Sequence, residues 1–248
     1  MFFARIYYEW KLHWKALLLA PLLLIIACSL FALLQLQMRE NVGRSFLGFA
    51  EVFLPLSAGI MAGSMIVREP ALELLLTLRH DYRAISLQRL LLIIFSYACF
   101  CCLVISIMAT LHFWFLPRYL LSWPLLAQWL LAQLIWLVPL LWFVALSTCI
   151  TLVVRSDIVS GSVLAALWIS ELLYWGPFHD LSWLRAFYTF PTVMWIYQGD
   201  AISIPAWYFN EFWLLPHLEQ LAIALILFLA SWFLFHNTER LLKGATIA

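Results

Sequence analysis

The sequence predicts an all-α polytopic integral membrane protein with six transmembrane helices, and three observations carry the prediction. Of the 248 residues, 66% are hydrophobic and 11% are charged, whereas a soluble domain has about half and about a quarter. Residues 16–36 and 90–115 are continuous apolar runs, long enough to cross a hydrocarbon layer of about 30 Å. The runs lack the alternation of a membrane barrel, and a bilayer accepts only helices or closed barrels. We therefore expect a single transmembrane domain over residues 1–248.

The N-terminal residues 2–15 predict an amphipathic helix lying in the membrane interface. Phe3, Ile6 and Trp10 recur at helical spacing, opposite Arg5 and Glu9. The apolar run that follows has no small-residue cleavage site, so we expect a retained span rather than a signal peptide.

The remaining apolar runs predict the other spans in order. Pro124 and Pro139 lie in the fourth run, which is longer than a membrane needs, and either proline can divide or kink it. The six expected spans are residues 16–37, 46–67, 90–116, 121–154, 157–176 and 215–236.

Residues 177–214 are too polar to span a membrane and too aromatic to form a solvated loop. Tryptophan and tyrosine settle at headgroup depth because one end of each ring is polar. We expect short helices or a re-entrant piece on the outer face, before the last span.

The positions of the basic residues predict that both termini are cytoplasmic. The residues placed inside by this orientation are Arg5, Lys11, Lys15, Arg68, Arg79, Arg83, Arg89, Arg155, Arg240 and Lys243. Those placed outside are fewer: Arg39, Arg44, Arg118 and Arg185. The net charge of +1 provides no basic field for a nucleic acid. The cysteines and histidines lack the spacing of a metal site or of a disulfide framework.

The charged stretch between the second and third expected spans is the most informative segment. Pro70 can open a helix, and Glu69, Glu73, Thr77 and His80 then form one polar stripe beside a leucine face. Such a helix suits docking of a soluble partner, with a plain interfacial helix as the alternative.

This stretch resembles the type-2 membrane permeases of ATP-binding-cassette (ABC) exporters. Those permeases have an Arg-Glu pair, a short gap and then Leu-Glu-Leu-Leu-Leu, which Arg68-Glu69 and residues 72–76 match. The chain departs from the family pattern at Pro70-Ala71, where Gly-Thr is usual, and at Arg79-His80, where a proline is usual. The basic corner at residues 155–157 and the aromatic outer segment fit the same family.

The resemblance implies a dimer of permease chains, each bound through residues 68–83 to a separate ATPase subunit. ATP and Mg²⁺ would be held by that partner, because the chain has no GxxxxGK[ST] phosphate loop. The second permease chain would be identical or a sister chain, and a hydrophobic or amphipathic cargo would leave along the dimer interface, lined by the second and fifth spans. The expected docking residues are Arg68, Glu69, Glu73, Thr77, Arg79, His80 and Arg83.

Small residues and methionines in the second and fifth spans are candidates for the substrate path or the dimer seam. Close packing within one subunit is the alternative for the glycines, and gap filling is the alternative for the methionines. We interpret Glu171 as the one carboxylate deep in an apolar run, which contacts cargo or a proton, or else pairs locally. The candidates are Gly59, Met61, Gly63, Met65, Ser162, Ala166 and Glu171.

Two other classes of function share the composition. A membrane-embedded protease or lipid-modifying transferase needs a nucleophile and a base, and Ser160-Gly161-Ser162 lacks the pattern of a nucleophile elbow. A non-catalytic membrane assembly factor would differ from the transporter only in having no ATPase partner.

Overall fold

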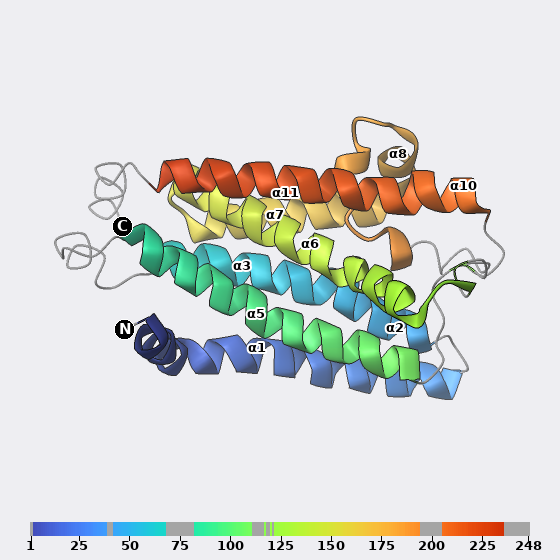
Figure 1. Cartoon of the computed structure of the whole chain (residues 1–248), viewed down its shortest axis with the longest axis horizontal. Coiled ribbons are helices and arrows are strands. Elements are labelled where there is room, and N and C mark those ends of the chain that lie inside the picture. Colours follow the sequence, from blue (N-terminus) through green and yellow to red (C-terminus); the bar gives the residue numbers. More distant parts are fainter. Residues whose placement is uncertain are drawn as a thin grey trace.

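The fold is known from a computed structural model, which describes residues 2–38, 42–67, 82–110, 117, 120, 122–193 and 205–235. Within these residues every regular element is a helix, and none is a strand (Figure 1). Five helical runs are long and apolar enough to cross a membrane, which indicates an integral membrane protein. They are His13–Gln35, Ser45–Val67, Ala84–Met108, Leu125–Val154 and Ala206–Leu234.

The first helix, α1 (Phe2–Met38), combines two elements that the sequence separates. The expected interfacial helix over residues 2–15 and the first span form one continuous helix, because no proline or glycine separates them. Figure 1 shows the first turns of α1, beside the N label, pointing out of line with the rest of the helix.

The second pass contains a break in regular α-helix. It consists of α2 (Val42–Gly48), the π-helical segment η1 (Phe49–Phe53) and α3 (Leu54–Val67). A π-helical turn widens the helix by one residue and changes the carbonyls that remain available for other donors. Here the Ala50 carbonyl lies 3.8 Å from the Cys101 thiol, which donates to it from α5 (Tyr82–Thr110).

The fourth expected span is a single helix, α6 (Leu125–Val154). Pro124 immediately precedes it, and Pro139 is accommodated within it without ending the helix. The expected basic corner follows, where Arg155 adopts the left-handed conformation with φ of 60°. The Ser156 hydroxyl then accepts a hydrogen bond from the Val159 amide at 3.3 Å and caps the next helix.

The fifth expected span is shorter in the structure than the sequence predicts, so five of the described helices have membrane length. That span corresponds to α7 (Asp157–Leu173), which has 17 residues and is therefore about 25 Å long. The helix is shorter than a hydrocarbon layer of about 30 Å. It ends because the chain turns at Tyr174 into the short helix α8 (Trp175–Asp180).

A second interrupted helix forms the last pass. It comprises α10 (Ala206–Phe209), the π-helical segment η4 (Asn210–Leu214) and α11 (Leu215–Leu234). It begins nine residues before the expected start at residue 215, since 215 − 206 = 9. Between α8 and α10, the described residues include a short 3₁₀ turn, η3 (Arg185–Phe187).

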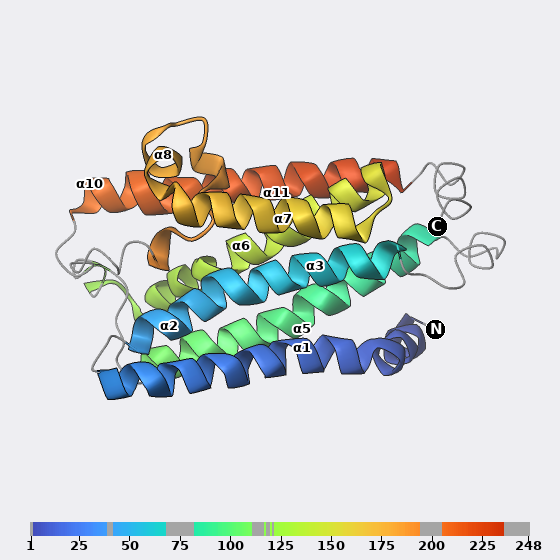
Figure 2. The ribbon, with the colours of Figure 1, turned by 180° about the vertical axis from the view of Figure 1, so that it is seen from behind.

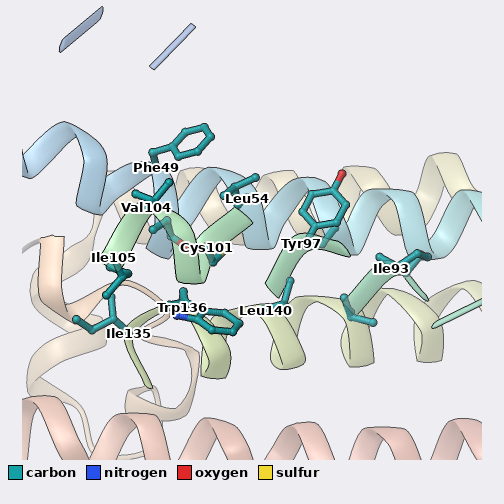
Figure 3. Close-up of a cluster of buried hydrophobic side chains, with 14 of the residues drawn as sticks. Phe49, Leu54, Ile93, Tyr97, Cys101, Val104, Ile105, Ile135, Trp136 and Leu140 are labelled. Atoms are coloured by element: carbon teal, nitrogen blue, oxygen red, sulfur yellow. Dashed lines mark hydrogen bonds between the residues drawn. The ribbon is translucent and has the colours of Figure 1, made fainter. Parts of the chain in front are cut away.

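Helix α6 is the centre of the bundle and packs chiefly against α3 and α11. The larger buried cluster joins α1, η1, α3, α5 and α6, and Figure 3 shows Leu54, Tyr97 and Trp136 among its side chains. A smaller cluster joins α6, α7 and α11 around Trp142 and Phe143.

The helical passes alternate in direction, so the bundle has two distinct ends (Figures 1 and 2). We call the end where α3 ends and α5 begins the linker end, because residues 68–81 connect those helices. The opposite end, where α1 ends and α2 begins, is called the clamp end, because two buried glutamates hold a segment of backbone there.

Candidate functional site: a segment held by two buried carboxylates

The segment Tyr188–Val193 enters the clamp end of the bundle as non-repetitive backbone followed by the start of a helical turn. Tyr188, Thr189, Phe190 and Thr192 each expose 4% or less of their surface. A buried backbone without regular partners must find other acceptors for its amides, since an unpaired buried amide costs about 1–3 kcal/mol. We call this stretch the inserted segment.

Glu51 holds the C-terminal half of the inserted segment. It lies in the π-helical segment η1 and is fully buried. Its two carboxylate oxygens accept the amides of Thr192 at 2.9 Å and Val193 at 2.7 Å. One side chain from the second pass therefore binds a backbone that lies 141 residues further along the chain.

Glu171 holds the other half in the same manner. It lies near the end of α7, is 2% exposed, and accepts the amides of Thr189 and Phe190, the latter at 3.2 Å. The Thr189 hydroxyl also donates to it at 2.6 Å.

Together, the two carboxylates account for the amides of the inserted segment. The Tyr188 amide donates to the Arg185 carbonyl at 3.0 Å, and Pro191 has no amide hydrogen to satisfy. The four remaining amides, those of residues 189, 190, 192 and 193, all donate to Glu51 or Glu171. The segment is thus fixed by side chains imported from two different helices, and we call the arrangement the carboxylate clamp.

The last pass closes the third side of the clamp. The Trp213 indole donates to the Thr192 hydroxyl at 2.8 Å, and the Gln220 amide donates to the Tyr188 carbonyl. Trp213 lies in η4, so both π-helical segments of the structure contribute a side chain that contacts Thr192. Such segments occur often at functional sites.

The His217 ring continues this network along the last pass. It lies tilted against the Trp213 ring, with 4.3 Å between the ring centroids. Its Nδ1 donates to the Trp213 carbonyl at 2.6 Å, which a widened helix leaves available. Trp213 is therefore held at both its backbone and its ring.

The carboxylates also define the electrostatics of the inserted segment. Their hydrogen-bond partners are backbone amides and threonine side chains rather than basic residues. Burial, followed by the carboxylates of Glu171 and Glu51, raises the pKa of Tyr188 above its usual range. The Tyr188 phenol therefore stays protonated beside the clamp.

The expected docking residues cannot be placed together. Arg68, Glu69, Glu73, Thr77, Arg79 and His80 lie outside the described residues. Arg83 lies in the first turn of α5, at the linker end of the bundle. Their role in docking stays a prediction.

The small residues of the second pass pack inside the chain. A Cβ atom on Gly59 would lie 2.9 Å from the Phe143 carbonyl oxygen of α6. One on Gly63 would lie 2.8 Å from the Ser147 hydroxyl oxygen. The glycines therefore allow α3 to approach α6, which is the packing alternative left open by the sequence.

The other candidates for a substrate path lie in separate environments. Met61 is buried and its sulfur accepts a weak hydrogen bond from the Tyr97 hydroxyl at 3.7 Å. Met65 is half-buried against the larger cluster. Ser162 and Ala166 are exposed on α7, so the structure does not bring these four residues to one site.

Glu171 pairs locally, as one of its two interpretations expects, but it is not the only carboxylate deep in an apolar run. Glu51 lies inside the expected second span and is more deeply buried. Its position within an apolar stretch is a signal in the sequence, since an ionisable residue there needs a partner. Sequence reasoning missed it because the partner is a distant backbone and not another side-chain motif.

Ser147 of α6 and Ser160 of α7 form a small polar pair outside the clamp. The hydroxyls of Ser147 and Ser160 lie 2.9 Å apart, and Ser160 also donates to the Ser147 carbonyl at 3.2 Å. Within the described residues, no group of three or more His, Cys, Asp or Glu side chains could hold a metal ion.

Comparisons with known proteins do not add a relationship. No family model matches the chain, and no curated protein and no solved structure matches it.

Proposed function

We propose that the chain is the permease subunit of an ABC exporter, which moves a hydrophobic or amphipathic cargo using ATP hydrolysed by a separate subunit. The observation that carries the proposal is the division of the bundle into two ends. Helix α3 ends and α5 begins at the same end of the bundle as the turn from α6 to α7 (Figure 1). Residues 68–81, which lie between α3 and α5 in the sequence, contain the acidic, leucine-rich motif. The carboxylate clamp lies at the opposite end.

This arrangement suits a protein that is driven from one side of a membrane. An ATPase bound at the linker end would move the ends of α3 and α5, and the close packing between α3 and α6 would carry the movement along the bundle. The clamp connects α3, through η1, to α7 and to the last pass. A displacement of α3 would therefore be coupled to the cargo-releasing end.

The finer features of the proposal follow the same orientation. Helix α7 would serve as a short sixth span, completed by the inserted segment, and both termini would lie in the cytoplasm of a prokaryotic inner membrane. The exposed Ser162 and Ala166 on α7 would face a second permease chain, because small residues allow two helices to approach closely. Lipid would surround the remaining apolar faces.

Co-purification tests the proposal most simply. The tagged full-length chain, extracted in mild detergent from its native membrane, is expected to bring with it a P-loop ATPase whose activity depends on Mg²⁺. A reproducible preparation without such an ATPase would contradict the exporter function.

A charge-reversal pair tests the docking segment. Glu69→Arg combined with Glu73→Arg should abolish recovery of the ATPase while leaving membrane insertion intact. The matched control is Asp180→Arg combined with Glu211→Arg, which makes the same charge change at exposed positions of the clamp end. Equal recovery of the ATPase with both double variants would remove docking from residues 68–83.

A further inference from the structure

A cavity of about 540 Å³ lies between α1 and the α2–η1 part of the second pass. This volume is within the usual range of small-molecule sites. One wall is a stripe of α1 that includes Leu24, Cys28 and Gln35, and the opposite wall includes Phe49 of η1. Val193, whose amide donates to Glu51, also lines the cavity, so the carboxylate clamp helps to shape it.

The cavity changes in polarity along its length. None of the residues that line it is charged, and at its polar end the Ser45 hydroxyl donates to the Gln35 side-chain oxygen. Gln35 ends one membrane-length run and Ser45 begins the next, so this polar pair lies at the depth where hydrocarbon meets headgroups. From Gln35 the α1 wall descends to Leu24, a distance of about 16 Å along the helix.

The mouth of the cavity is apolar and exposed. Phe31 and Phe53 line it and are 55% and 45% exposed. On a helix that crosses a membrane, such exposed aromatic side chains contact lipid rather than water, so a hydrocarbon chain can enter from the bilayer without crossing a polar barrier.

We propose that this cavity binds one hydrocarbon chain of an amphiphile whose uncharged polar group, such as an ester or a hydroxyl, meets Gln35 and Ser45. An amide and a hydroxyl offer both donors and acceptors but no charge, which favours an ester or hydroxyl over a phosphate or a carboxylate. The chain lies along the α1 stripe toward Leu24, against Phe49. This inference does not rest on the proposed ATP-driven transport.

Photolabelling tests the site directly. The full-length chain in phosphatidylcholine nanodiscs is exposed to a monoacylglycerol with a diazirine in the middle of its acyl chain, and the adducts are mapped by mass spectrometry. We expect the adducts to concentrate on the lining residues, with Phe31, Phe49 and Phe53 foremost. Adducts spread evenly over the exposed faces of α1 would overturn the proposal.

A pair of tryptophan substitutions on α1 provides the matched control. Ala27 is exposed and lines the cavity, and Ala27→Trp should lower the labelling about tenfold or more, because the indole takes the place of two or three methylene groups. Leu30 is 58% exposed on the same helix and does not line the cavity, so Leu30→Trp should leave the labelling unchanged. Equal labelling of both variants, each eluting as a monodisperse species, would contradict the assignment.

Two further arms define the ligand. Gln35→Leu should weaken labelling by the monoacylglycerol about tenfold, because the polar group then loses its hydrogen-bonding partner; unchanged labelling would contradict the polar end of the site. These competitions are carried out in mild detergent, where bilayer lipid is not already in excess. Competition by unlabelled monoacylglycerol alone identifies a single-chain amphiphile, whereas equal competition by added phosphatidylcholine identifies a chain of a bilayer lipid. Labelling that neither competitor reduces would overturn specific binding.

Discussion

The α3–α6 seam and the inserted segment solve the same problem in different ways. Both bring backbone into the apolar interior, where an unpaired polar group is costly. At the seam, each helix satisfies its own amides, and Gly59 and Gly63 only make room for the approach. The inserted segment has no such internal partners, and Glu51 and Glu171 supply them. The first solution depends on the absence of side chains, and the second on two specific ones.

Removing a carboxylate should have the largest effect on this comparison. Glu51→Leu leaves two buried amides without acceptors, which should lower the free energy of unfolding by about 2–6 kcal/mol at about 1–3 kcal/mol for each amide. Glu171→Leu should cost a similar amount for the same reason. Thermal unfolding in mild detergent measures both.

A control variant distinguishes the loss of the clamp hydrogen bonds from the loss of a carboxylate in general. Glu211 is exposed on the last pass, and Glu211→Leu should change the free energy of unfolding by no more than about 0.5 kcal/mol. If Glu51→Leu were as harmless as Glu211→Leu, the carboxylate would not be needed to fix the inserted segment.

A smaller effect is expected at the α3–α6 seam, where a substitution introduces a steric clash and removes no hydrogen bond. Gly59→Ala places a Cβ atom 2.9 Å from the Phe143 carbonyl oxygen and should destabilise the protein by about 1–3 kcal/mol. Gly161→Ala on α7 meets nothing within 4 Å, so it should be neutral or stabilise the helix by up to about 1 kcal/mol. Equal melting temperatures for the two variants would show that the seam is looser than described.

The contact between Thr192 and the last pass should make the smallest contribution. Thr192→Val removes the acceptor of the Trp213 indole and should cost about 1 kcal/mol. Thr192→Ser keeps the hydroxyl and should cost less. A serine variant as unstable as the valine variant would assign the effect to packing of the methyl group instead of the hydrogen bond.

The difference between the two regions also explains what the sequence could predict. The apolar runs and the Arg155 corner are local signals, and the structure confirms an all-helical chain with membrane-length helices and a tight turn at residues 155–156. The small residues around Gly59 and Gly63 are also local, and they predict close helix packing without identifying the partner helix.

The carboxylate clamp could not be predicted in the same way. The amides that Glu51 accepts are 141 and 142 residues away in sequence and carry no side-chain signature. Any residue except proline has an amide, so no motif marks the inserted segment as the partner. The sequence also overestimates the length of α7, because residues 174–176 are apolar or small and extend the hydropathy pattern beyond the point where the helix ends.

Amide hydrogen exchange of the inserted segment tests the central claim most directly, because the clamp consists of hydrogen bonds from particular backbone amides. In the unaltered protein, the amides of residues 189, 190, 192 and 193 should be protected, as expected for hydrogen-bonded backbone in a buried core. Glu51→Gln keeps one oxygen acceptor but places the side-chain NH2 group against one of the two backbone amides of residues 192 and 193. These two amides should therefore exchange about tenfold faster or more. The amides at the centre of α6 should exchange at an unchanged rate. Rapid exchange of all four amides in the unaltered protein, or identical exchange in the variant, would contradict the account.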